Sequence, residues 1–239
     1  MQNTVFLGLS QQMALKRQME VIANNIANTN TIGFKSEQML FREYLTETQN
    51  GRPLSMVQGY AIDRNMRPGE AVKTSNPLDL SLMGGGFFVV ETDDGPRYTR
   101  SGHFQLDAKG TLINAQGQKV KTVDNRDIIF TPDEGSITVA SDGTVSTRNG
   151  VKGRLQIVEF DSPKQLNKMG EGLYQTDMPT NKAKDTFVTQ GQLEQSNVQP
   201  VIEMTRMIEV MRAYQGTKKT LETDHDLQRQ AYKRLAKVN

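Results

Sequence analysis

Cysteine and histidine, which many catalytic and metal sites use, are almost absent from this 239-residue chain. The chain has no cysteine, which excludes disulfides, thiolate catalysis and zinc sites built from cysteine. Its two histidines, His103 and His225, lie far apart in the sequence, so we do not expect a histidine-rich metal site. On a strand, His103 and Asp107 would share one face but lie about 13 Å apart, too far for an acid–base pair. We interpret His103 as a partly exposed turn residue.

Acidic and glycine-rich segments are the remaining candidates for chemistry. Asp93–Asp94, Asp133–Glu134 and Asp161 have the surroundings of turn residues, and no spacing indicates the paired carboxylates of glycosidic cleavage. Gly84–Gly86 lacks the spacing of a phosphate-binding loop and precedes a strand instead of a helix, which predicts a turn or a close backbone approach. The sequence therefore predicts no catalytic, cofactor-binding or metal-binding residue, and no enzymatic activity.

Composition narrows the class of protein further. The net charge is +2 and hydrophobic residues make up 36% of the chain, so neither nucleic acid nor an anionic membrane is expected as a partner. The mean hydropathy of −0.58 permits a core, though not a large one. No apolar run approaches the roughly 20 residues of a membrane span, and no basic segment precedes an apolar one at the N-terminus, so we expect no cleavable secretory signal.

The C-terminal stretch Val201–Val238 predicts a long helix. Apolar residues recur there at alternating spacings of three and four, with polar residues at other seam positions, which is a heptad register. The apolar positions are Met204, Met207, Met211, Tyr214 and Leu221, resuming at Tyr232 and Leu235, and the polar ones are Lys218, His225 and Gln228. Pro200 suits the first turn of such a helix, because its missing N–H has no partner to lose there. At about 1.5 Å per residue the helix exceeds about 50 Å and needs a partner helix.

The N-terminal stretch Met1–Ala27 predicts the other helix. Its apolar stripe comprises Leu15, Met19, Ile22 and Ile26, with Val5, Leu9 and Met13 toward the N-terminus. The two stripes could pack on each other or on another subunit. Ordering a residue costs about 1–2 kcal/mol, and a narrow stripe cannot offset that cost alone. Our hypothesis is that the terminal helices are poorly ordered in the monomer and pack only in an assembly.

An asparagine-rich segment follows the first helix. Asn24, Asn25, Asn28 and Asn30 precede Gly33, which supplies a positive φ where one is needed. Two interpretations stay open: the amides cap a frayed helix end, or they bind the backbone of a neighbouring subunit. Residues 34–48 then indicate a second helical or extended arm.

The middle of the chain predicts a compact antiparallel β-domain. Residues 55–80 suggest short strands and loops, and from Leu80 onward the apolar period is two, with Asp-Gly and Asn-Gly turns about every ten residues. The expected strands lie at residues 87–90, 97–100, 103–106, 111–113, 137–139, 144–146, 155–160 and 186–189. No βαβ alternation is present. We predict an α+β fold in which residues 1–50 and 190–239 form a coiled-coil-like helical domain and residues 51–189 form the β-rich domain.

Three segments carry a resemblance to a known family. They are Ala23–Lys35, Thr99–Phe104, and Gly191–Val198 running into Met207–Gln215. Together they resemble the signature motifs of bacterial flagellar rod and hook proteins, and the short middle resembles a proximal-rod subunit more than a hook subunit. The chain departs from the family pattern at His103, where asparagine is usual, and at Gly216–Thr217, where Ala-Asn is usual.

The resemblance implies a structural subunit of the flagellar basal-body rod in the periplasm. Such a subunit would pass through the flagellar type III export apparatus and join copies of itself and other rod proteins in a helical shaft that transmits torque. The residues expected at subunit interfaces are Leu15, Met19, Ile22, Asn24, Asn25, Ile26, Asn28, Gly33, Phe34, Met204, Met207, Met211, Tyr214 and Leu221. Two alternatives stay open: a distal-rod or hook-type axial subunit, and a β-domain that binds or hydrolyses cell-wall glycan.

Overall fold

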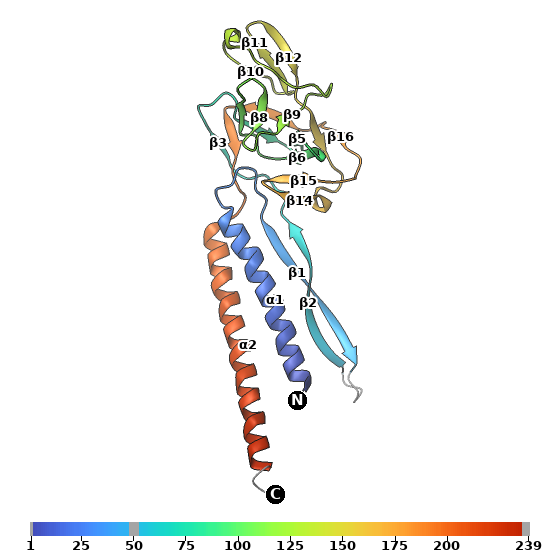
Figure 1. Ribbon diagram of the computed structural model, residues 1–239, viewed down its shortest axis with the longest axis vertical. Helices are drawn as coiled ribbons and strands as arrows, with labels where there is room; N and C mark the ends of the chain where they lie inside the picture. The colour runs from blue at the N-terminus through green and yellow to red at the C-terminus, as the bar shows by residue number, and fades with distance from the viewer. Residues whose placement is uncertain (1, 48–52, 236–239) are drawn as a thin grey trace. The chain divides into compact units, whose positions relative to one another are not determined.

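The computed structural model describes residues 2–47 and 53–235 (Figure 1). Its contacts divide the chain into two compact units, which we describe separately. Unit 1 comprises residues 1–27, 37–64 and 199–239, and unit 2 comprises residues 28–36 and 65–198. The fold is α+β, with one helix near each end of the chain and an antiparallel β-domain between them, which confirms the predicted class.

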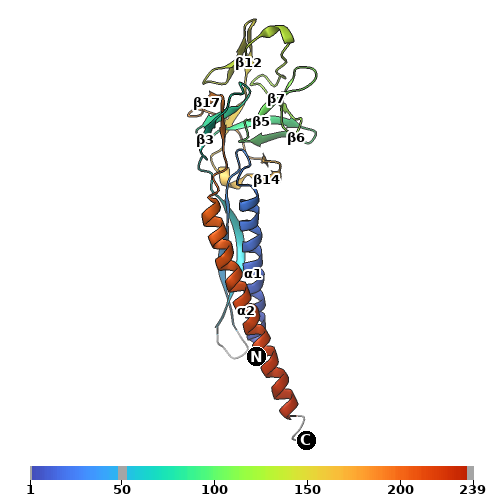
Figure 2. The ribbon, with the colours of Figure 1, turned by 90° about the vertical axis from the view of Figure 1, so that its left-hand side faces the viewer.

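Unit 1 contains two long helices, α1 (Gln2–Ala27) and α2 (Pro200–Leu235). They are antiparallel, because Gly8 of α1 lies against Leu221 of α2 while Asn25 binds Glu203. Figures 1 and 2 show the pair side by side from two directions. Both helices lie where the sequence predicted them, with Pro200 in the first turn of α2; residues 236–238 of the predicted helix lie outside the described residues.

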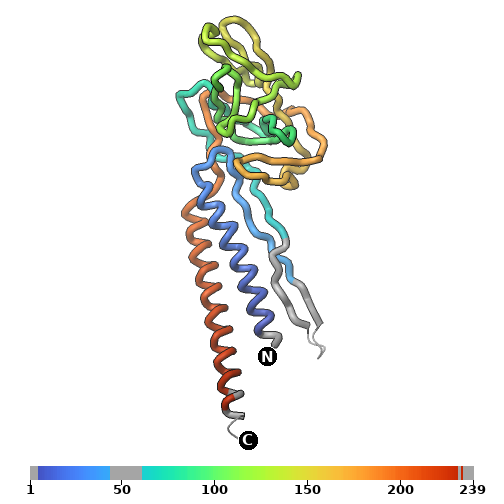
Figure 3. Tube along the Cα trace, viewed as in Figure 1, coloured from blue at the N-terminus to red at the C-terminus, as the bar shows by residue number. Residues whose placement is uncertain are grey.

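A long hairpin completes unit 1. Strand β1 (Glu37–Glu47) pairs antiparallel with β2 (Pro53–Arg64), and Figure 3 follows the Cα trace of this part of the chain. The arm after the first helix is thus extended, which was one of its two predicted forms. The register shifts between Leu40 and Phe41, which pair with Ala61 and Gly59, so one extra residue on β2 forms a bulge. At twelve residues, β2 is longer than the short strands expected for this region.

Unit 2 is built from antiparallel strands. The described strands are β3 (Ala71–Lys73), β4 (Leu80–Met83), β5 (Phe87–Thr92), β6 (Gly95–Thr99), β7 (Phe104–Leu106), β8 (Leu112–Asn114), β9 (Lys119–Val120), β10 (Thr138–Val139), β11 (Thr144–Thr147), β12 (Gly150–Arg154), β13 (Ile157–Glu159), β14 (Asn167–Gly170), β15 (Leu173–Gln175), β16 (Asn181–Lys182), β17 (Phe187–Gln190) and β18 (Gln192–Glu194). The largest sheet runs β14-β15-β6-β5-β9-β8-β7, with β13 pairing to β5 and β16. Smaller sheets are β10-β11-β12, β17-β4 and β18-β3. Short 3-10 turns lie at Pro132–Glu134 and Pro163–Gln165.

Strand β5 is the centre of unit 2, because both of its faces are buried. Phe88 and Val90 point into one hydrophobic cluster with Phe104, and Phe87 and Val89 point into a second cluster. This alternation follows from the two-residue period of a strand. Edge-to-face ring contacts strengthen each side, with centroids 5.1 Å apart for Phe88–Phe104 and 5.6 Å for Phe87–Phe160.

The predicted domain limits at residues 50 and 190 do not coincide with these contact units. Residues 28–36 and 190–198 pack with the β-strands of unit 2, whereas 53–64 pack with the helices of unit 1. Which of these segments fold together as independent domains stays a prediction.

Candidate functional site

The three sequence motifs meet inside unit 2 around Glu194. The carboxylate of Glu194, at the end of β18, forms ion pairs with Lys35 and with Arg100, the latter at 3.1 Å between Nη2 and Oε2. All three side chains are 3% exposed or less. Lys35 Nζ also donates to the carbonyl of Arg67 at 2.9 Å, and the N–H of Gly69 donates to Glu194 Oε1 at 3.1 Å. This buried cluster joins residues that are 159 positions apart in the sequence.

The electrostatics of the cluster depend on Glu194. Burial lowers the pKa of Lys35 and the pKa of Arg100, because a desolvated cation is disfavoured. The Glu194 carboxylate opposes both shifts by its charge and its hydrogen bonds, whereas Arg100 adds to the lowering at Lys35. One buried anion therefore serves two buried cations, and without it each cation would face the other's charge.

Backbone contacts hold the segment 28–36 in place beside this cluster. The N–H of Gly33 donates to the carbonyl of Glu194 at 2.8 Å. The side chain of Asn197 accepts the N–H of Ser36 at 2.7 Å and donates to the carbonyls of Asn65 and Arg67, each at 2.8 Å. Gly33 has φ +69°, and a Cβ there would lie 2.7 Å from the backbone of Arg100. Both observations explain why glycine occupies this position.

The glycine run 84–86 lies against Arg100 of the same cluster. The guanidinium of Arg100 donates to the carbonyl of Gly84 at 2.9 Å and also to the carbonyl of Gly86. A Cβ on Gly86 would lie 2.8 Å from the side chains of Ile157 and Thr186. The run is thus a close backbone approach, one of the two forms the sequence predicted.

In unit 1, Asn25 joins segments that are distant in the sequence, as Glu194 does in unit 2. Its side chain accepts the N–H of Glu37 at 2.9 Å and donates to the carbonyl of Glu37 at 2.7 Å, so it pairs with β1 as a backbone would. It also donates to Glu203 Oε2 at 3.1 Å, and Glu203 Oε1 accepts from Arg206 at 2.8 Å. Asn25 therefore ties α1, β1 and α2 together within one chain, a role that neither interpretation of the asparagines included.

The structure distributes the residues expected at subunit interfaces between buried and exposed positions. Ile22, Asn25, Gly33 and Phe34 are buried, whereas Asn24, Met204 and Met211 are exposed. The others are partly buried: Leu15, Met19, Ile26, Asn28, Met207, Tyr214 and Leu221. Phe34 lies under Lys168, whose Nζ is 4.3 Å from the ring centroid. Whether any of them contacts a second subunit stays a prediction.

The face of α2 that turns away from solvent keeps a heptad spacing with a different membership. From residue 201 to 230, the positions that are not exposed are Glu203, Met207, Val210, Tyr214, Thr217, Leu221, Asp224 and Gln228. This set shares Met207, Tyr214, Leu221 and Gln228 with the predicted seam. Of the other predicted positions, Met204, Met211, Lys218 and His225 are exposed, and the side chains of Tyr232 and Leu235 are outside what the structure describes.

Consequently each helix presents an apolar stripe to solvent. On α2 the stripe comprises Val201, Met204, Ile208 and Met211, and on α1 it comprises Phe6, Leu9 and Met13. Met204 is 51% exposed and Phe6 is 60% exposed. Since α1 and α2 are antiparallel, the two stripes lie toward opposite ends of the helix pair. Large apolar side chains gathered in this way mark an interaction surface.

His103 lies beside the carboxylate of Asp79. His103 Nδ1 lies 2.7 Å from Asp79 Oδ1, and His103 is half-buried beside a β-bridge between the same two residues. Among the described residues, no three histidine, aspartate or glutamate side chains gather as metal ligands would. No helix in the described ranges combines the length and apolarity needed to cross a membrane.

The sequence interpretation did not single out Lys35, Arg100, Glu194 and Glu203. All four lie in or beside the quoted motifs, which was the one available signal. Their pairing depends on which distant segments meet, and local spacing does not carry that information.

Three protein-family models match this chain, each over a segment that contains one of the three motifs. Residues 8–35 match the model of the flagella basal body rod protein, residues 81–147 that of the flagellar hook protein FlgE/F/G D1 domain, and residues 189–234 that of the flagellar basal body rod FlgEFG protein C-terminal region. The chain is 38% identical to the flagellar basal-body rod protein FlgF of Caulobacter vibrioides over the full length of both. It is 31% identical to FlgF of Mesorhizobium japonicum over 91% of each chain. It is 30% identical to FlgG of Bacillus subtilis over 95% of this chain and 97% of that one.

Proposed function

This chain belongs to the family of flagellar basal-body rod proteins and is a structural subunit of the rod, and from that premise we propose how it acts there. Its two terminal helices bind copies of itself and other rod proteins through their exposed apolar stripes. The product is a helical polymer, because head-to-tail contacts that do not close into a ring continue indefinitely. The polymer is the drive shaft that transmits motor torque across the periplasm to the hook, and this role needs no catalytic group.

The observation that carries the proposal is the pair of exposed stripes, seven large apolar side chains in all. Burying such a side chain completely contributes about 1.5–3 kcal/mol, and these are already partly covered. Their combined contribution is therefore close to the 4–15 kcal/mol that association costs in lost motional freedom. One contact of this kind is marginal, so stable incorporation requires several neighbours at once, as a helical lattice provides.

In the assembled rod we propose that α1 and α2 pack as a coiled-coil-like layer. The heptad-spaced face already turned toward α1 would form one seam, and the exposed stripe would form a second seam against another subunit. Many staggered helix pairs then resist twisting together, which is what a rotating shaft requires.

The position along the rod is also a proposal. The similarity to FlgF proteins over the whole chain supports the proximal rod, and the similarity to FlgG proteins makes the distal rod the alternative. Delivery through the flagellar type III export apparatus follows from the same family resemblance. Labelling the subunit in isolated basal bodies and locating it by electron microscopy distinguishes the two positions.

The test of the proposed interface changes the exposed stripe of α2. Replacing Met204, Ile208 and Met211 by glutamine removes apolar surface that contacts solvent in the isolated chain. Each exposed substitution changes the free energy of unfolding by about 0.5 kcal/mol or less. We therefore expect normal folding, measured by urea denaturation, together with loss of the subunit from isolated basal bodies and loss of swimming.

The matched control replaces three exposed polar residues of the same helix, Glu209, Arg212 and Gln215, by alanine. It should fold and swim like the unmodified chain. A triple glutamine variant that folds and still builds functional rods would refute the proposed interface.

A further inference from the structure

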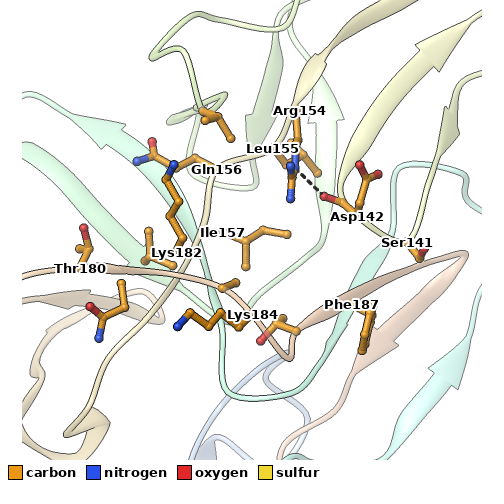
Figure 4. Close-up of a pocket in the computed structure, with 15 residues that line it drawn as sticks. Ser141, Asp142, Arg154, Leu155, Gln156, Ile157, Thr180, Lys182, Lys184 and Phe187 are labelled. Carbon is orange, nitrogen blue, oxygen red and sulfur yellow. Dashed lines mark hydrogen bonds between the residues drawn. The ribbon is translucent and has the colours of Figure 1, made fainter.

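A basic pocket in unit 2 has no part in the function described so far. Its volume is about 510 Å³, and it is lined by the turn at Ser141–Asp142, the stretch 154–158 and the residues 180–184, 186 and 187. Figure 4 shows Ile157 between Lys182 and Lys184 on one side and Arg154 and Asp142 on the other. The pocket thus combines an apolar floor with three cationic side chains.

The single carboxylate that lines this pocket, Asp142, is hydrogen-bonded to Thr144 and keeps its negative charge. Asp142 Oδ1 accepts the N–H of Thr144 at 3.0 Å, and Asp142 Oδ2 accepts the Thr144 hydroxyl at 2.8 Å. Arg154 Nε donates to the backbone carbonyl of Asp142 at 2.9 Å, not to its carboxylate. Lys182, Lys184 and Arg154 form no ion pair with any other residue in the ranges that the structure describes. Three cations therefore face one lining carboxylate, which leaves the pocket with a net positive charge.

A complementary group lies elsewhere in the same unit. The turn between β5 and β6 carries two adjacent exposed carboxylates, Asp93 and Asp94, and the side chain of Asp94 is 86% exposed. Asp94 forms an exposed ion pair with Arg97, at 3.9 Å between Oδ2 and Nη2. The Thr92 hydroxyl donates to the carbonyl of Gly95 at 2.7 Å, which holds the turn in one shape. A narrow, ordered, acidic projection is a suitable occupant for a basic pocket.

The turn of one copy cannot reach the pocket of that same copy. Ile157 and Val158 of the pocket pair with Phe88 and Phe87 at the beginning of β5, whereas the acidic turn follows Thr92 at its end. At about 3.3 Å per residue, the intervening strand is about 15–20 Å long. Donor and acceptor groups at opposite ends of one strand produce a head-to-tail contact, which repeats from copy to copy.

We propose that the acidic turn Asp93–Asp94 of one copy docks into the basic pocket at Arg154, Lys182 and Lys184 of the next copy. The inference rests on the proposed polymer and assigns it a contact between β-units, in addition to the contacts between helices. Exposed ion pairs contribute little to affinity but suppress wrong alignments. The contact therefore sets the register between neighbouring subunits.

Cross-linking tests the contact directly, because the natural chain contains no cysteine. The full chain carrying Asp94→Cys and Lys184→Cys replaces the normal copy in cells, and isolated basal bodies are oxidised and run on a non-reducing gel. We expect disulfide-linked multimers that disappear on reduction. The matched control carries Asp94→Cys with Asn149→Cys, an exposed turn position outside the pocket, and should give no more multimers than Asp94→Cys alone.

Charge reversal supplies an independent test. Cells with Asp93→Lys and Asp94→Lys, or with Lys182→Glu and Lys184→Glu, should lose swimming, and cells with all four changes should regain it because the charges attract again. If only the pocket variant is impaired and the fourfold variant does not recover, the pocket takes another anion and the proposal is overturned.

The proposed function and this inference fail differently. Absence of the unmodified subunit from basal bodies would refute the rod assignment. Normal incorporation of the double-cysteine chain without cross-links would overturn the docking contact and leave the rod assignment intact.

Discussion

Glu194 is the residue whose environment has the clearest energetic consequence. It stands between two buried cations, Lys35 and Arg100, and its backbone also binds Gly33. We predict that Glu194→Gln lowers the free energy of unfolding by about 3–5 kcal/mol, because two buried cations then lose their anion. Urea denaturation followed by circular dichroism measures the loss.

Two further variants make this prediction specific. Adding Lys35→Met to Glu194→Gln should recover part of the stability, since one of the two unpaired cations is removed. Glu70→Gln changes an exposed glutamate in the same unit and should stay within about 0.5 kcal/mol of the natural chain. Equal stability of Glu194→Gln and Glu70→Gln would contradict the prediction.

Carboxylates at the turns of unit 2 predict the response to acid. Hydrogen bonds lower the pKa of Asp107, Asp127, Glu134 and Asp142, and a nearby lysine or, at Asp142, Arg154 lowers it further. A carboxyl with a lower pKa in the folded chain binds protons more readily when unfolded, so its stabilisation is complete above the ordinary values of 3.8 and 4.5. We expect the urea midpoint to be constant from neutral pH to about pH 5 and to fall below that.

The matched variant for the acid response is Asp107→Asn with Asp142→Asn. Asparagine keeps the oxygen that accepts the backbone N–H groups of Thr111 and Thr144 but does not titrate. The urea midpoint of this variant should fall less steeply in acid. An unchanged pH profile would show that these carboxylates do not control the acid response.

Residue roles of this kind could be predicted only in part. The spacing around Gly33 and the run at Gly84–Gly86 correctly indicated backbone constraints. The charge cluster was not predictable, because Lys35 and Glu194 come from distant segments and neither looks unusual among 29 basic and 27 acidic residues.

At the scale of elements, Asn25 joins two helices and a strand. Asn25→Ala would leave the N–H and carbonyl of Glu37 and the carboxylate of Glu203 without this partner, at about 1–3 kcal/mol for each unsatisfied buried group. We predict faster hydrogen exchange in peptides that cover residues 37–43, measured by mass spectrometry.

Asn30→Ala is the matched control, because Asn30 is an exposed asparagine that follows α1. Its exchange pattern over residues 37–43 should equal that of the natural chain. If Asn25→Ala also leaves this exchange pattern unchanged, the hydrogen bonds between Asn25 and Glu37 do not stabilise β1.

Apolar periodicity found both helices but misplaced half of the inward face of α2. A search for apolar residues selects Met204 and Met211, whereas the chain turns Glu203 and Val210 inward. Glu203 can lie there because Asn25 and Arg206 satisfy its carboxylate. A polar pair across the helices thus overrides the simple hydrophobic pattern.

The hairpin of unit 1 shows the second limit of sequence patterns. The sequence predicted short strands and loops from residue 55, yet Gly59 pairs with Phe41 inside one continuous strand. Glycine there marks the bulge at which the register shifts. Strand β5 was predicted well, since a Phe-Phe-Val-Val run followed by an Asp-Asp-Gly turn has few other interpretations.

At the scale of the whole molecule, the two units should differ in local stability. Strand β5 is buried on both faces, whereas each helix leaves an apolar stripe in solvent. We predict that amides of α1 and α2 exchange faster than those of β5 in the purified chain, and become protected in isolated basal bodies. This measurement also tests the hypothesis that the helices are poorly ordered before assembly.

The outcome against that hypothesis is equally clear. Helix amides protected as strongly as those of β5 in a monomeric sample would show that the helix pair is stable alone. Assembly would then join preformed surfaces instead of ordering them.

The opposite placement of the two stripes along the antiparallel helices gives the growing shaft a direction. A subunit that binds one stripe of the previous subunit still exposes its own second stripe, which is displaced along the helix axis. That second stripe is then the binding site for the next subunit. A shaft built in this way is polar, because one tip leaves the stripe of α1 uncovered and the other tip leaves the stripe of α2 uncovered.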